Sequence, residues 1–240
     1  MDTEFVANIA AIAISLGVGI PILRKSWRER NRPGVLLSLA VISDGLEWFF
    51  WALCIYTPAY GTPLGDAFSV LCRIGITVSA FFFLAFTREV FRPESRIASA
   101  FAWVLRIGMI VGFVGTGLVG DWPGLRNDNC WAQIENVAQM AVYVWSFSEC
   151  MVYYAKMRRR IEHGLASPVV TNRILLWGFY SAGFVVSIIL YGVVLAFFED
   201  VTALDSFIAV STIAGEVALW LAFFPPARYL AWVRGEATAH

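Results

Sequence analysis

Seven ionisable side chains lie inside long apolar stretches of the sequence, where a charge is costly and is a functional candidate by default. They are Asp44, Glu47, Arg73, Arg106, Glu135, Glu149 and Glu216. Because five acids face two arginines, up to three carboxyl groups must be protonated, hydrated or bound to a cation. A carboxyl group buried without a counter-charge keeps its proton and can donate it. Acid catalysis and proton transfer are therefore the chemistry that this set could perform.

Two of the acids are grouped. Asp44 and Glu47 are three residues apart, so they share one helical face, which continues to the rings of Trp48 and Trp51. With Glu216 opposite, these groups would line an apolar pocket with a few convergent polar atoms, the usual form of a small-molecule site. The structural alternative is that the rings fill the core or face lipid, and that the acids bond to Ser, Tyr or Arg.

The two arginines have candidate partners. Arg106 and Glu149 lie at matching depths on consecutive apolar segments, which predicts a structural ion pair. Arg73 could compensate any of three acids in the same half of the membrane: Asp44, Glu47 or Glu135. The sequence does not choose among these three.

Composition defines the fold class that must position these groups. Of 240 residues, 59% are hydrophobic and 15% are charged, whereas an average soluble domain has about 25% charged residues. A membrane helix needs about 20 mostly apolar residues. Seven segments qualify, at about 5–23, 35–57, 65–87, 98–119, 131–155, 174–198 and 206–224. We therefore expect an all-α, polytopic membrane protein whose residues 1–240 form a single seven-transmembrane-helix bundle.

Smaller signals refine the helices. Gly108 and Gly112 are four residues apart and form a small-residue face that lets a neighbouring helix approach closely. Pro225 and Pro226 end the last segment, because proline removes a backbone donor and clashes with the preceding turn.

Charge distribution predicts the orientation. Fifteen of the 18 Lys and Arg residues follow the first, third and fifth segments or lie in the C-terminal tail. The positive-inside rule places that side in the cytoplasm and the N-terminus outside. These cations lie at the lipid surface and require no nucleic-acid partner. We expect a multi-pass integral protein of the plasma membrane, or of the inner membrane if the source is bacterial.

Scarce residue types exclude several chemistries. Both lysines, Lys25 and Lys156, lie at cytoplasmic edges, so no amine inside the bundle can hold retinal as a Schiff base. His163 and His240 cannot face each other within the membrane, which excludes bis-histidine haem ligation. We expect no metal and no cofactor.

Cys72 and Cys130 both fall toward the outer face. A disulfide between them would tie the third segment to the loop before the fifth. The alternative is that both are small buried hydrophobic residues.

One family resemblance rests on these residues. The acid before two aromatics in Glu47-Trp48-Phe49, the acid Glu216 in the last segment, seven spans and this chain length together resemble the integral-membrane terpene cyclases of meroterpenoid and indole-terpenoid pathways. The resemblance implies that Glu47 and Glu216 protonate an epoxide or olefin and start cyclisation, with Asp44 beside them. A lipophilic isoprenoid would fold against aromatic faces, which stabilise a carbocation. The pocket candidates are Trp48, Trp51, Arg73, Trp145 and Tyr180.

Two other classes stay open. A non-retinal seven-helix receptor or sensor would use the outer N-terminus, the Cys72–Cys130 tie and a basic cytoplasmic face that could dock a partner protein, whose identity the sequence leaves open. A proton-coupled transporter would use Asp44, Glu47 and Glu216 as a relay.

Overall fold

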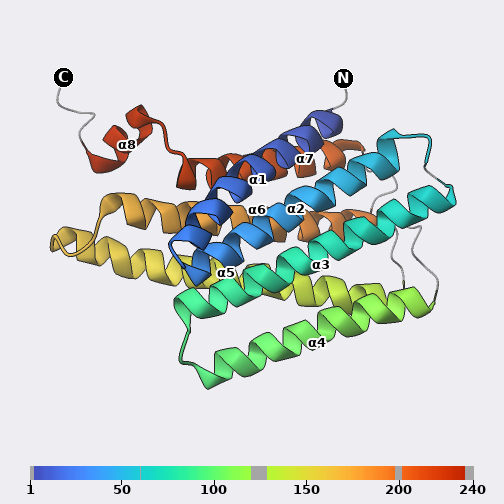
Figure 1. Cartoon of the computed structure of the whole chain (residues 1–240), viewed down its shortest axis with the longest axis horizontal. Helices are drawn as coiled ribbons and strands as arrows, with labels where there is room; N and C mark the ends of the chain where they lie inside the picture. The colour runs from blue at the N-terminus through green and yellow to red at the C-terminus, as the bar shows by residue number, and fades with distance from the viewer. Residues whose placement is uncertain (1–2, 60, 120–128, 198–201, 236–240) are drawn as a thin grey trace. The chain divides into compact units, whose positions relative to one another are not determined.

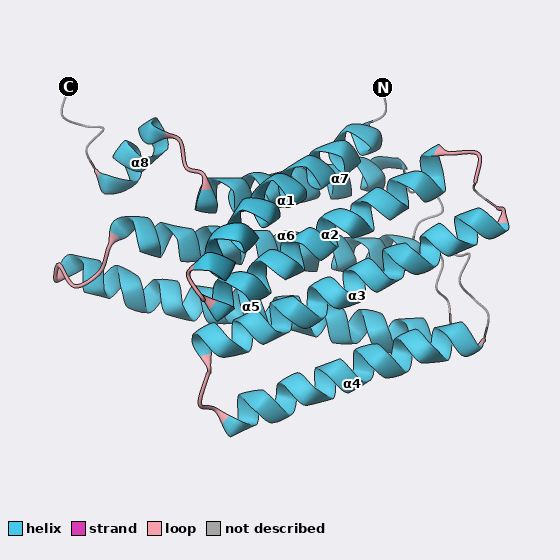
Figure 2. Cartoon of the chain, in the orientation of Figure 1, coloured by secondary structure: helices cyan, strands magenta, loops and turns pink. Residues whose placement is uncertain are grey.

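The computed structural model describes residues 3–59, 61–119, 129–197 and 202–235, and all regular elements within these ranges are helices (Figures 1 and 2). They are α1 (Thr3–Arg28), α2 (Arg32–Tyr56), α3 (Pro63–Phe91), α4 (Arg96–Leu118), α5 (Cys130–Glu162), α6 (Pro168–Phe197), α7 (Thr202–Phe223) and α8 (Ala227–Arg234). The predicted all-α class is confirmed, and each predicted apolar segment coincides with one helix from α1 to α7. The short helix α8, which follows Pro225 and Pro226, is an addition to that prediction.

Five helical stretches of the described chain are long and apolar enough to cross a membrane. They are Phe5–Arg28, Arg32–Tyr56, Pro63–Phe91, Arg96–Leu118 and Pro168–Ser187. The structure is therefore that of a helical protein suited to a membrane.

Helix α4 illustrates this property on its surface. Its side chains Ile97, Val104 and Leu118 are 84%, 64% and 83% exposed. Soluble proteins rarely expose apolar side chains in such continuous faces, whereas lipid tails solvate them. The outer face of α4 is accordingly suited to lipid.

Helix α5 is the least apolar of the long helices, because polar side chains interrupt its hydrophobic sequence. Two of these, Glu135 and Gln139, are 1% and 3% exposed. Their polarity is satisfied within the protein, as described below.

The chain divides into two compact units, residues 1–142 and 143–240. In the first unit, α1 packs on α2, α2 on α3 and α3 on α4 (Figure 1). The turns between them are capped: the side chains of Asn31, Thr62 and Ser95 accept hydrogen bonds from the first backbone N–H groups of α2, α3 and α4. These caps fix where α2, α3 and α4 begin.

Glycines bring α4 against the first part of α5. A Cβ atom added at Gly108 would lie 3.3 Å from Cβ of Ala138, and one at Gly112 would lie 2.6 Å from the backbone nitrogen of Glu135. Gly115 lies directly against the Trp131 ring. The predicted small-residue face at Gly108 and Gly112 is thus a real helix contact, and it extends by one more turn.

In the second unit, aromatic side chains are part of the core. The rings of Tyr143 and Phe184 are stacked, with centroids 4.4 Å apart, and Tyr180 meets Phe184 edge-on at 5.3 Å. Helix α6 packs on α7 and on α8. The Asn172 side chain donates a hydrogen bond of 2.7 Å to the Tyr229 hydroxyl, which holds α8 against the start of α6.

The close contact at Gly112 predicts a stability change. In Gly112→Ala the new methyl group meets backbone atoms, which cannot move aside, so the free energy of unfolding should fall by about 1–3 kcal/mol. SDS titration followed by far-ultraviolet circular dichroism measures this loss. Gly17→Ala is the matched control, because a Cβ atom there meets nothing within 4 Å. Equal stabilities for the two variants would contradict the tight α4–α5 contact.

Candidate functional site

The acids of α2 face the helices on either side of it. Asp44 is fully buried, and the Ser15 hydroxyl of α1 donates to its Oδ2 at 3.3 Å. One turn further on, Glu47 lies against α3: a Cβ atom at Gly75 would be 3.0 Å from both the Cα and the backbone nitrogen of Glu47. A serine on α1 and a glycine on α3 therefore set the surroundings of this pair.

Glu47 differs from Glu135 in having no counter-charge among the described residues. Its Oε2 atom is buried and has no hydrogen-bond partner, and its carboxyl group forms no ion pair within the part of the chain that the structure describes. The adjacent indole nitrogen of Trp48 is also buried without a partner there. A buried acceptor and a buried donor thus lie on consecutive residues, and each such group normally has a partner in a native protein.

Arg73 on α3 pairs with Glu135 on α5. Its Nε atom donates to Glu135 Oε2 at 2.8 Å, and its Nη2 atom lies 2.8 Å from the same oxygen. The two side chains are 12% and 1% exposed, so this ion pair is nearly dry. Of the three partners that the sequence left open for Arg73, the structure selects Glu135.

Three neutral side chains form hydrogen bonds with this ion pair. Thr77 and Gln139 donate to Glu135 Oε1 at 2.6 and 3.1 Å, and Arg73 Nη2 donates to the Thr116 hydroxyl at 3.4 Å. We name Arg73, Thr77, Thr116, Glu135 and Gln139 the α3–α5 network. Sequence reasoning missed its three neutral members. The available signal was spacing: Thr77 and Gln139 lie four residues after Arg73 and Glu135, on the same helical faces.

The second unit holds four predicted site residues, Trp145, Glu149, Tyr180 and Glu216. Glu216 on α7 is 1% exposed, and Tyr180 is 4% exposed within the aromatic core. Glu149 accepts a hydrogen bond of 3.2 Å from the indole nitrogen of Trp145, its neighbour one turn away. Tyr180 and Trp145 are thus engaged with residues of their own unit.

Three predicted contacts join residues of different units. Glu47 and Glu216 belong to different units, so their sharing of one chamber stays a prediction, as does the approach of Trp145 and Tyr180 to the acids of α2. Arg106 and Glu149 are likewise divided, and their ion pair stays a prediction. Within its own unit, the Arg106 guanidinium lies 5.3 Å from the Trp103 ring centroid, a cation–π contact.

The remaining candidates are placed as follows. Trp51 is partly buried on α2. Cys72 is partly buried and Cys130 is exposed, and both are free cysteines in the structure. Buried Cys54 lies 3.3 Å from the Ser69 hydroxyl. Among the described residues, no group of three His, Cys, Asp or Glu side chains is placed to hold a metal ion.

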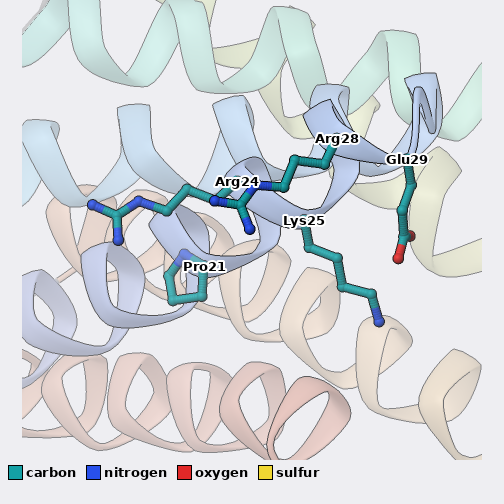
Figure 3. A pocket seen from close by; sticks show the side chains of 5 residues that line it. All are labelled: Pro21, Arg24, Lys25, Arg28 and Glu29. Atoms are coloured by element: carbon teal, nitrogen blue, oxygen red, sulfur yellow. The ribbon is translucent and has the colours of Figure 1, made fainter.

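Two cavities lie at other places in the first unit. One, of about 400 Å³, lies at the C-terminal end of α1 (Figure 3). The other, of about 450 Å³, surrounds the turn between α2 and α3. Neither of these two is lined by Asp44 or Glu47.

Comparisons of the chain with protein-family models, with curated proteins and with solved structures gave no match. The residues themselves are therefore the basis for any functional conclusion.

The Arg73–Glu135 ion pair predicts how stability should change in two single variants and in the double variant that combines them. Arg73→Met alone or Glu135→Leu alone leaves a buried charge without its partner, which should cost about 3–5 kcal/mol of unfolding free energy. The double variant should recover most of that loss, because it removes both charges and keeps similar volume. Arg96→Gln, at an exposed site, is the control and should change stability by less than about 0.5 kcal/mol. Additive losses in the double variant, measured by SDS titration, would contradict the pairing.

Proposed function

We propose that the chain is a seven-span integral membrane protein with its N-terminus outside and its C-terminus in the cytoplasm. Five stretches already meet the length and hydropathy that a span requires. We add α5, because its buried polar groups are satisfied internally, and α7, whose described part includes the apolar stretch Ile213–Phe223. The basic ends of α1, α3 and α5 support the orientation.

This topology predicts the accessibility of two cysteines. In a variant that retains only Cys130, a membrane-impermeant maleimide should label intact cells, because α5 begins at the outer face. In the matched variant that carries only Glu94→Cys, between α3 and α4, labelling should require permeabilised cells. The reverse pattern would contradict the orientation.

We further propose that the protein binds a small lipophilic molecule at Asp44 and Glu47 and acts on it as an acid, as an isoprenoid cyclase does. One observation carries the proposal: Glu47 presents a buried carboxylate oxygen with no partner among the described residues, while Arg73 is engaged with Glu135. An acid in an apolar span that lacks a cation holds its proton. Such an acid is a donor kept away from water.

The chemistry follows from this placement. The Glu47 O–H bond breaks as its proton passes to the substrate. A protonated epoxide opens by breaking a C–O bond, and a protonated olefin uses its π electron pair for the new C–H bond, so either substrate becomes a carbocation. A second double bond of the substrate then donates its electron pair to this cation and closes a ring. Aromatic faces such as that of Trp48 stabilise the positive charge, and the exclusion of water prevents its premature capture. A carboxylate of this acid pair, left when Glu47 gave up its proton, accepts a proton from the final cation, which gives a neutral cyclic product and restores the acid. Asp44, held by Ser15 one turn away, would position Glu47 or return its proton.

The proposal predicts the behaviour of Glu47→Gln, which keeps the size of the side chain but cannot donate a carboxylic proton. Product formation from a panel of prenylated olefins and epoxides, measured by gas chromatography with mass spectrometry, should fall at least about a hundredfold. Membrane insertion should be unchanged. Glu94→Gln, an exposed acid between α3 and α4, is the control and should keep full turnover. Full turnover by Glu47→Gln would end the hypothesis.

A proton-coupled transporter is the second candidate, favoured by polar contacts between α1 and α2. Asn8 donates to the Tyr56 hydroxyl at 3.3 Å and Ser15 donates to Asp44 at 3.3 Å, so polar groups flank Glu47 in both directions along α2. Glu47-dependent proton uptake into vesicles, with no conversion of any isoprenoid, would favour this function over the cyclase.

A further inference from the structure

The cavity at the end of α1 has an unusual lining. Its residues are Pro21, Arg24, Lys25, Arg28 and Glu29, all from one helix end, and we name it the α1 groove. Figure 3 shows the Arg28 side chain running back along the helix toward Arg24. Such a direction is typical of helical side chains, which lean toward the N-terminus. The groove therefore presents two guanidinium groups on one helical face.

The charges of this groove have no ion-pair partner among the described residues. Three cations face one acid, and none of the four side chains forms an ion pair or hydrogen bond with another described residue. Arg32, a few residues further on, does have such a partner, since it lies 3.2 Å from Glu89. The α1 groove thus carries a local excess of two positive charges in a concave setting.

An apolar stripe leads from the membrane interior into the groove. Exposed residues of α1 recur three or four positions apart, and the same face continues to Arg24 and Arg28. The members of the stripe are Val6, Ile9, Ala13, Gly17 and Ile20. From Ala13 to Arg24 the helix rises about 16 Å, which is close to half of a hydrocarbon core of about 30 Å. One face of α1 is therefore apolar over the depth of one leaflet and cationic at its end.

We propose that the α1 groove binds the headgroup of an anionic phospholipid, whose acyl chains lie along the exposed stripe of α1. The headgroup phosphate accepts charge-assisted hydrogen bonds from Arg24 and Arg28, and Lys25 adds a third positive charge. Near a membrane surface each Lys or Arg strengthens binding to anionic lipid about fivefold. Three such groups correspond to a preference on the order of a hundredfold. This lipid site is independent of the chemistry proposed at Glu47.

Native mass spectrometry of the full chain in detergent tests the proposal, with phosphatidylglycerol and phosphatidylcholine of identical acyl chains as probes. The wild type should retain phosphatidylglycerol much more tightly. The triple variant Arg24→Gln/Lys25→Gln/Arg28→Gln should lose about a hundredfold of that affinity. Arg30 and Arg32 remain in this variant to keep the orientation, which the cysteine labelling described above can verify.

A control variant that removes the same number of positive charges elsewhere distinguishes a lipid site at α1 from a general attraction of the basic surface to anionic lipid. The variant Arg158→Gln/Arg159→Gln/Arg160→Gln removes three cations at the end of α5 and should keep the phosphatidylglycerol bound at α1. Equal loss in both triple variants, or equal retention of the two lipids by the wild type, would overturn the proposal. Displacement of the lipid by millimolar inorganic phosphate would also overturn it, because the site would then bind a free anion.

A measurement on the unmodified protein covers the case in which the triple variant fails to fold. A photoactivatable phosphatidylglycerol in vesicles should form adducts within residues 13–28, mapped by peptide mass spectrometry. Adducts elsewhere and not in this stretch would contradict the assignment.

Discussion

The buried ion pair between Arg73 and Glu135 is the constraint on which the rest of the first unit depends. A charge within an apolar helix is tolerated only where a counter-charge and hydrogen bonds satisfy it. The α3–α5 network supplies both, since Thr77 and Gln139 bond to the carboxylate and Thr116 to the guanidinium. Helices α3, α4 and α5 each contribute to this network, so none of them can shift without exposing a charge to apolar surroundings.

Small residues make that pairing possible, and they also explain why Arg73 pairs with Glu135. Gly112 lets the backbone of α5 approach α4 at Glu135. On α3, Gly75 lies against Glu47 of α2, two residues after Arg73. Two residues on a helix are about 200° apart, so Arg73 and Gly75 occupy opposite faces of α3. The face that packs on α2 is therefore the one that carries no cation.

Because Arg73 points away from α2, the acids of α2 have no cation of α3 beside them. The carboxyl groups of Asp44 and Glu47 lie between α1 and α3, where the neutral Ser15 hydroxyl donates to Asp44 and Oε2 of Glu47 has no partner among the described residues. In the second unit, the Phe184 ring stacks on the Tyr143 ring and meets the Tyr180 ring edge-on. Both units therefore bury an acid, Asp44 in the first and Glu216 in the second.

The amino-acid sequence by itself determined the helices, because apolar length, proline and capping residues act locally. It also identified the charged residues that need explanation and the glycine face at Gly108 and Gly112, since helical spacing puts such residues on one face. Only the tertiary structure decided which acid pairs with Arg73, because depth along a helix leaves rotation about its axis open and neutral partners such as Thr116 carry no charge signal. The choice followed from two close approaches of helix backbones, α3 against α2 at Gly75 and α4 against α5 at Gly112, so it depends on four helices at once.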